Sequence, residues 1–431
     1  MRFQDKNSTK KLFWDVFLPQ DAFLTEKNVK SCEKYTVIFL RQLVNFLLIT
    51  YDYIYMLCFY SVKNYRGFKD TLTLDLTSSN YEFNHECVRD GYAHKALIYG
   101  HNGVGKSNLG LAIMDIIINL TDKEKSLLLT NNYKNAESGS NLVEFKYKFK
   151  FHDIMVEYQY GKITPEYLRY EYLFINEKCV VSYNRNKNEP LEIKLPGTQT
   201  LNKDINKIPI SVLKYIKSNA ALEQSDETTV LVSLFDFVDR MLFFRNLDDR
   251  SYAGYNVGSH QLFDEIVSKN HFGSFKSFLA DADVPSNITF REMDNQTIVF
   301  FEYEISQDEK YLIDFFANCS TGMKSLTVLF YWLQNAIFNE ISPSFIFIDE
   351  FDAFYHQRLS EYVVKLIKEI YDCQFILTTH DTGVMSNDIM RPDCLFLMHK
   401  NKIESLSSLT DKELRFAHNI EKMYRAGAFD E

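Results

Sequence analysis

A glycine-rich octapeptide is the most informative chemical pattern in the chain. Residues 100–107 read Gly-His-Asn-Gly-Val-Gly-Lys-Ser, which completes the phosphate-binding pattern G-x-x-x-x-G-K-[ST]. Glycines in such a loop let backbone N–H groups turn toward a phosphate, and the following helix adds its N-terminal dipole. We expect Lys106 to reach the β- and γ-phosphates of a nucleotide and Ser107 to ligate Mg²⁺. The residues predicted to contact the nucleotide are Gly100, Asn102, Gly103, Val104, Gly105, Lys106, Ser107 and Asn108.

Two carboxylates at the end of an apolar run form the second pattern. Residues 345–350 read Phe-Ile-Phe-Ile-Asp-Glu, and ligands of open α/β sheets sit at the carboxyl ends of such strands. We expect Asp349 to hold the Mg²⁺ shell and Glu350 to polarise the attacking water as the general base. Alone, the same pattern is as common in a strand that ends in a solvated turn, so this interpretation depends on the phosphate-binding loop.

A third apolar run, residues 375–381, ends in Thr-Thr-His-Asp. His380 at this strand end is predicted to be catalytic, because an imidazole there can hydrogen-bond a γ-phosphate and sense whether it is present. A lone histidine at a strand end is more often structural, and only the neighbouring motifs favour the catalytic role. Asp352 and His356 either continue the same site or cap the helix that follows.

The fourth pattern, residues 319–325, reads Cys-Ser-Thr-Gly-Met-Lys-Ser and opens a predicted helix. A serine followed by a glycine at a helix N-terminus offers a hydroxyl, backbone N–H groups and a positive dipole end to a γ-phosphate. We predict Ser320 and Gly322 as the contacts. The alternative is a plain N-cap by Ser320 or Thr321.

The elements that must position these motifs are visible in the hydrophobic periodicity. A strand at 95–99 precedes the glycine-rich loop and a helix at 108–120 follows it. The short apolar runs at 344–348 and 374–378 are typical of a parallel sheet covered on both faces. The other predicted elements are strands at 57–60, 71–76, 288–290 and 297–305, an antiparallel meander over 143–160 and 167–183, a loop at 184–200, helices throughout 205–279, and a helix at 324–339.

Composition restricts the partners and the compartment. The net charge is −10, so a contact with nucleic acid would need a local basic patch. The seven cysteines are scattered without a CxxC pair, which indicates a reducing compartment, and we expect a cytoplasmic protein. The apolar stretch 35–60 is interrupted by Arg41 and Asp52, whose charges make membrane insertion costly, so we expect no stable insertion. It is either an extra helix packed on the domain or a segment upstream of a natural start at Met56.

The order of the four motifs resembles that of the ABC ATPases of the SMC and Rad50 type. The chain is most similar to the AAA_15 and AAA_21 type ATPases, the OLD-like ATPases of bacterial anti-phage defence. This likeness extends from residue 57 to the C-terminus. Residues that carry it are the ranges 62–68, 102–108, 349–352 with His356, and 417–429.

The resemblance implies ATP and Mg²⁺ as cofactors and a homodimer or higher homo-oligomer. In such a dimer Ser320 and Gly322 would close the ATP site of the other subunit, Asp352 would be the D-loop residue near the seam, and Arg66 would approach the ATP phosphates. The chain departs from the family in reading Ser-Thr-Gly-Met-Lys where Ser-Gly-Gly-Glu/Gln is usual. No Q-loop is evident, and Gln159 is only a weak candidate.

The resemblance implies an α/β fold: a P-loop ABC-type ATPase domain whose mixed or parallel sheet is flanked by helices and interrupted by a β-meander plus helical insertion. The predicted division is an N-terminal extension (1–55), a first half with the P-loop (56–132), the insertion (133–285), and a second half with the signature, Walker B and switch histidine (286–431).

The predicted function is a nucleotide-gated dimer switch that binds and hydrolyses ATP in anti-phage defence, with a nuclease or toxin effector encoded nearby. A Rad50-like DNA-repair ATPase that binds nucleic acid is the alternative, which the acidic balance disfavours. A transporter subunit is disfavoured by the missing Q-loop and the long insertion. The short stretch after His380 is too small for a Toprim nuclease domain, and no Asn-Lys-x-Asp motif supports a GTPase.

Overall fold

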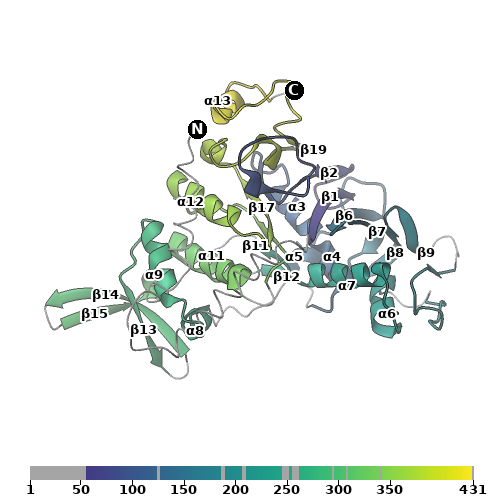
Figure 1. Ribbon diagram of the computed structural model, residues 1–431, viewed down its shortest axis with the longest axis horizontal. Helices are drawn as coiled ribbons and strands as arrows, with labels where there is room; N and C mark the ends of the chain where they lie inside the picture. Colours follow the sequence, from purple (N-terminus) through teal and green to yellow (C-terminus); the bar gives the residue numbers. More distant parts are fainter. Residues whose placement is uncertain are drawn as a thin grey trace. The chain divides into compact units, whose positions relative to one another are not determined.

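The computed structural model describes residues 55–123, 127–185, 190–205, 210–244, 252–254, 262–293, 296–306, 309–338 and 342–429 (Figure 1). The predicted N-terminal extension therefore lies outside the described residues, except for Tyr55. The chain divides into two compact units. The larger comprises residues 54–256, 340–353 and 370–431; the smaller contains residues 257–339 and 354–369. Among the described residues, no helix has the length and apolar character needed to cross a membrane.

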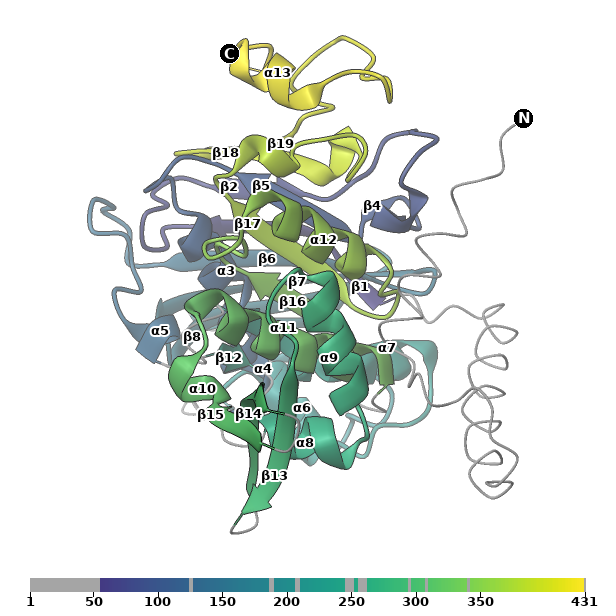
Figure 2. The same ribbon diagram turned by 90° about the vertical axis from the view of Figure 1, so that its left-hand side faces the viewer.

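A mainly parallel sheet forms the centre of the larger unit. Its order is β12-β11-β16-β17-β5-β18-β19, and the five inner strands run parallel while the two edge strands are antiparallel. Figure 2 shows β5, β16 and β17 in this sheet. Nearly every residue of the inner strands is buried, as the fully apolar runs predict. The bounds are β5 Lys95–Tyr99, β11 Met241–Phe244, β12 Tyr252–Gly254, β16 Phe345–Ile348, β17 Gln374–Thr379, β18 Leu395–His399 and β19 Lys402–Ser405.

One sequence prediction in this sheet is wrong. We expected helices throughout 205–279, but residues 241–244 and 252–254 form the strands β11 and β12. The four apolar residues of β11 are all buried beside β16, and a fully apolar run this short carries no periodicity that separates a strand from a helix.

A seven-stranded antiparallel sheet is the second layer of the larger unit. Its order is β10-β9-β8-β7-β6-β1-β2, so the predicted meander is confirmed as β6 to β9. Periodicity does not reveal that β6 pairs directly with β1, which joins the meander to the first described strand. The bounds are β1 Tyr55–Lys63, β2 Leu72–Asp75, β6 Val143–Phe151, β7 Ile154–Thr164, β8 Tyr167–Ile175, β9 Lys178–Asn184 and β10 Glu192–Ile193.

The two sheets are connected by Gln374 at the start of β17. Its side chain accepts from the Leu57 N–H and donates to the Leu57 carbonyl of β1, both at 2.9 Å. The larger unit also contains helices α3 Lys106–Ile113, α4 Asp115–Leu120, α5 Leu127–Thr130, α6 Val212–Asn219, α7 Asp226–Asp239 and α13 Ile420–Arg425. Its smaller elements are η2 His85–Cys87, β3 Val88–Arg89, β4 Tyr92–Ala93, η3 Thr382–Val384 and η4 Pro392–Cys394.

The smaller unit is built from helices and a three-stranded antiparallel sheet, β13-β14-β15. Phenylalanines join the sheet to the helices and the helices to one another. Measured between ring centroids, Phe301 of β14 lies 4.9 Å from Phe315 of α10, and Phe275 of α9 lies 5.1 Å from Phe330 of α11. The sequence predicted β13 and β14 but not β15. The bounds are α8 Leu262–Ser268, α9 Phe272–Asp281, β13 Ile288–Met293, β14 Gln296–Ser306, β15 Glu309–Asp314, α10 Phe315–Asn318, α11 Thr321–Phe338 and α12 Gln357–Lys368.

Candidate functional site

The glycine-rich loop connects β5 to α3, in the strand–loop–helix order that a phosphate-binding loop requires. Gly103 and Gly105 have φ values of 84° and 111°, a region that disfavours side chains. A Cβ on Gly105 would also lie 2.7 Å from Cε1 of Phe68, and one on Gly100 would lie 2.7 Å from the Met398 carbonyl oxygen. Backbone conformation and close packing therefore both require the glycines of the loop.

Lys106 is the first residue of α3 and is buried. Its ammonium group donates to the Gly100 carbonyl at 2.6 Å and to the His101 carbonyl at 3.3 Å, so it lies over its own loop. No described side chain caps the N-terminus of α3. The first N–H groups of the helix and its dipole are consequently available to an anion at the loop.

Asp349 follows β16 and lies beside the loop. Its carboxylate accepts a hydrogen bond from the Thr378 hydroxyl at 2.6 Å and lies close enough to the Ser107 side chain for Ser107 to lower its pKa. Burial raises the pKa of Asp349, while these two side chains and the charge of Lys106 oppose that rise. Ser107 and Asp349 thus present a hydroxyl and a carboxylate oxygen side by side, a pair of hard oxygen donors that suits Mg²⁺.

Three carboxylates act electrostatically on the ammonium group of Lys106. Burial lowers the pKa of this lysine, and the charges of Asp349, Glu350 and Asp352 act in the opposite direction. All three acids therefore lie within electrostatic range of Lys106.

Glu350 has a constrained backbone. Its φ is 49°, which is uncommon for a residue with a side chain, and its N–H donates to the Thr378 hydroxyl at 2.8 Å. Thr378 thereby bonds both Asp349 and Glu350, a role that the sequence analysis missed. Its only sequence signal is a polar residue at the end of β17, the strand beside β16.

Asp352 and His380 are both neighbours of Thr379, the last residue of β17. The Thr379 hydroxyl donates to Asp352, which is buried. Burial raises the pKa of Asp352, and the hydrogen bond from Thr379 opposes that rise. His380 itself is exposed. His356 is the N-cap of α12, one of the two roles predicted for it, because its Nδ1 accepts from the Leu359 N–H at 3.3 Å.

Arg66 lies in a turn whose next two residues, Gly67 and Phe68, approach the phosphate-binding loop and the helix after it. Phe68 contacts Gly105, and a Cβ on Gly67 would lie 3.4 Å from the Asn108 side chain. The Arg66 guanidinium is 5.4 Å from the centroid of the Tyr65 ring. Gln159 is in β7 and donates to Glu157 on the same strand.

The signature residues belong to the smaller unit. The Ser320 hydroxyl accepts from the Met323 N–H at 3.3 Å, which is the N-cap geometry of α11. A Cβ on Gly322 would lie 3.0 Å from the Phe354 carbonyl oxygen, so this position closely approaches the backbone.

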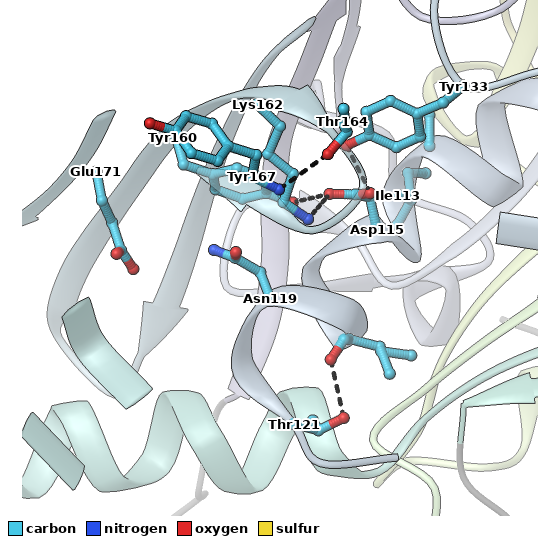
Figure 3. A network of polar contacts seen from close by, with 12 residues as sticks. Ile113, Asp115, Asn119, Thr121, Tyr133, Tyr160, Lys162, Thr164, Tyr167 and Glu171 are labelled. Carbon is cyan, nitrogen blue, oxygen red and sulfur yellow. Dashed lines mark hydrogen bonds and ion pairs between the residues drawn. The ribbon is translucent and has the colours of Figure 1, made fainter. Parts of the chain in front are cut away.

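A buried polar network holds the helices that follow the loop (Figure 3). The Asp115 carboxylate at the start of α4 accepts from the Tyr133 hydroxyl, the Tyr160 hydroxyl and the Lys162 ammonium group, at 2.9, 2.8 and 2.7 Å. The Tyr147 hydroxyl reaches the carbonyl groups of residues 112 and 113 at the end of α3. The sequence pattern does not reveal this network, since Asp115 and Lys162 lie 47 residues apart.

Comparison with known proteins yields one family and several solved structures. Residues 95–386 match the AAA_21 family model, described as "AAA domain, putative AbiEii toxin, Type IV TA system". No curated protein matches the chain. Similar solved structures include the SMC head domain from Thermotoga maritima, with 16% identity over 81% of this chain and 97% of that one and a TM-score of 0.39. Another is the recombination mediator RecF with ATP, with 13% identity over 82% of this chain and 100% of that one and a TM-score of 0.37.

Proposed function

The chain belongs to the AAA_21 family, and we propose that it binds ATP with Mg²⁺ and hydrolyses the ATP at the site formed by residues 100–107, 349 and 350. The observation that carries this proposal is the interaction of the Ser107 side chain with the Asp349 carboxylate, which lowers the pKa of Asp349 and brings the phosphate-binding loop to the end of β16. Two motifs more than 200 residues apart in the sequence meet there, with Lys106 and Glu350 beside them.

The nucleotide is bound by the chain's own donors. The glycine backbone and the N-terminus of α3 face the β-phosphate, and Lys106 exchanges its bonds to the loop carbonyls for bonds to the β- and γ-phosphates. Ser107 and Asp349 would hold Mg²⁺, which supplies charge neutralisation to the phosphate oxygens.

Glu350 orients the attacking water and accepts its proton. Its N–H bond to Thr378 fixes the backbone that directs this side chain, so the carboxylate is held at the end of β16. We assign to His380 the detection of the γ-phosphate, because it is exposed at the end of β17. Arg66 is assigned to the approach to the phosphates through the turn that contacts Gly105 and Asn108.

The proposed working form is a head-to-head homodimer. Ser320 and Gly322 at the start of α11 would close the ATP site of the partner subunit, with Asp352 at the seam. Binding of ATP closes this dimer and hydrolysis reopens it. We place the switch in the cytoplasm, in anti-phage defence with a separate nuclease or toxin effector; the family description names a putative toxin of a type IV toxin–antitoxin system.

Two substitutions test the site. Lys106→Ala should abolish ATP binding, because it removes the ammonium group that reaches the phosphates. Glu350→Gln should still bind ATP but lose at least about a hundredfold in turnover, the usual worth of general-base catalysis. Lys63→Ala and Glu144→Gln are matched controls from an exposed pair 3.9 Å apart and should leave both properties unchanged.

The measurements are calorimetric binding of ATP with Mg²⁺, phosphate release, and the mass in solution with and without ATP. The closed dimer should accumulate for Glu350→Gln with ATP. Normal turnover by Lys106→Ala would refute the assignment of the loop, and full activity of Glu350→Gln would remove Glu350 from the catalytic role.

A further inference from the structure

The loop that follows His380 is held from two sides. On its inner side, the Thr379 hydroxyl donates to Asp352 and accepts from the Asp381 N–H at 2.9 Å. The Asp381 carboxylate then accepts from the Gly383 N–H at 2.8 Å and caps the short helix η3. On its outer side, the Thr382 hydroxyl donates to Glu421 at 3.2 Å. His380 thus lies within a loop fixed by β17 and by the C-terminal helix α13.

The C-terminal segment is attached close to this loop at a second position. The Asn387 side chain donates to the Arg415 carbonyl at 2.9 Å, just before α13. Ile420 and Phe429 are both only 1% exposed, so apolar anchors hold the segment on the unit. Within α13, Arg425 forms an ion pair with Glu421 at 2.7 Å, which keeps the carboxylate oriented toward Thr382.

Glu421 also lies in the electrostatic field of the phosphate-binding loop. Tyr99, the last residue of β5, directly precedes Gly100 and is buried. Burial raises the pKa of Tyr99, and the charges of Asp352, Asp381 and Glu421 raise it further. Carboxylates from three separate segments therefore lie within electrostatic range of Tyr99, and Glu421 is the one contributed by the C-terminal segment.

We propose that Glu421 is a positioning residue for the loop 380–382, and that the C-terminal helix α13 thereby sets the rate of ATP hydrolysis. This inference rests on the proposed ATPase function. Glu421 does not touch the nucleotide in this role. It holds Thr382, and Thr382 restricts the loop that presents His380. Loss of this contact lets the loop move, so the chemical step slows while the contacts of Lys106 and Ser107 with ATP are kept.

Steady-state kinetics of the full chain test this role. Glu421→Ala and Thr382→Val should each lower kcat by about 10- to 150-fold, the effect of losing one hydrogen bond to a charged group. The KM for ATP should stay unchanged. The double variant should lose no more than Thr382→Val alone, because that substitution already removes the bonds of the Thr382 hydroxyl to Glu421 and Arg425. Glu421→Gln should recover most of kcat, since its amide oxygen still accepts from Thr382.

Glu413→Ala is the matched control. Glu413 belongs to the same C-terminal segment and forms an exposed pair with Arg415 at 3.0 Å, and no hydrogen bond joins it to the described loop 380–384. It should have wild-type kcat. An unchanged kcat in both Glu421→Ala and Thr382→Val, an equal loss in Glu413→Ala, or a parallel loss of ATP affinity would overturn the proposal.

Hydrogen exchange separates this proposal from the ATPase assignment. Without nucleotide, amides of residues 380–384 should exchange about tenfold faster in Glu421→Ala than in wild type, as expected for loss of a local hydrogen bond. Glu413→Ala should not change them. A wild-type chain that hydrolyses no ATP would contradict the proposed function alone. Equal exchange in Glu421→Ala and wild type would contradict the positioning role, whatever the activity.

Discussion

Removing one charge of the Asp115–Lys162 pair should destabilise the protein more than removing both. Asp115 is fully buried and the Lys162 side chain is 2% exposed, so water cannot solvate either group. Asp115→Asn keeps the shape of the side chain but leaves the ammonium group without a counter-charge. Removing one partner of a buried pair costs about 3–5 kcal/mol.

The double variant Asp115→Asn with Lys162→Met removes both charges at similar volume. Replacing a buried pair by uncharged groups is often neutral, and the amide oxygen at 115 still accepts from Tyr133 or Tyr160. One lost hydrogen bond leaves a cost of about 1 kcal/mol. The double variant should then be about 2–4 kcal/mol more stable than Asp115→Asn alone. The coupling is larger than this difference, because Lys162→Met alone also leaves an unpaired buried charge and its cost is subtracted as well.

Denaturant unfolding of the four proteins in this cycle measures the coupling, with the slopes compared to exclude a change of mechanism. The pair Asp122–Lys214 provides the control cycle. The Asp122 side chain is 91% exposed, so Asp122→Asn should change the unfolding free energy by less than about 1 kcal/mol. If the Asp115 and Lys162 effects add without coupling, the two groups do not act as a buried pair and this reasoning fails.

Two further substitutions test the packing and the charge of the central sheet. Gly110→Ala should cost about 1–3 kcal/mol and weaken ATP binding, because its Cβ would lie 2.5 Å from Phe347 and would push α3 from β16; Gly273→Ala, with open space around it, is the control. Burial lowers the pKa of Lys95 to about 7. Between about pH 7 and pH 10 this lysine is therefore protonated in the unfolded chain but neutral in the folded chain. Because the unfolded chain binds the extra proton, the contribution of Lys95 to the free energy of unfolding rises with pH in this range. The stability advantage of Lys95→Met over wild type should therefore be largest at or below pH 7 and shrink by up to about 1.4 kcal/mol per pH unit above it, as denaturant unfolding at several pH values would show; a constant difference would contradict a buried neutral lysine.

The phosphate-binding loop and the β16 carboxylates could be predicted because local patterns define them. The strand before Gly100, the glycines and the helix after Ser107 are contiguous, and the apolar run before Asp349 has the composition of a buried parallel strand. Parallel strands place their carboxyl ends at one edge, so the meeting of Lys106, Asp349 and Glu350 follows once both strands are assigned to one sheet. The division of the chain into domains remains a prediction.

Features that depend on distant partners could not be predicted in the same way. The Met-Leu-Phe-Phe run of β11 has no periodicity, and only its pairing with β16 decides that it is a strand. Thr378 is one polar residue at a strand end until β16 lies beside it. The tyrosines of the meander alternate as strand residues do, but nothing in that alternation identifies Asp115 as the acceptor of their hydroxyl groups.

The phosphate-binding loop and the buried Asp115–Lys162 pair are connected through the consecutive helices α3 and α4. This connection gives the charged pair in the core a role in positioning the nucleotide site. Lys106 and Ser107 are at the first turn of α3, Asp115 begins α4, and only Met114 separates the two helices. An apolar contact at Asp115 could slide, whereas a carboxylate with three donors has one geometry. The pair therefore fixes α4, and with it the register of α3, against β7. On this reasoning the double variant should fold well yet bind ATP less tightly than wild type, because it retains stability while losing the bond from Lys162, one of the three directional contacts at residue 115.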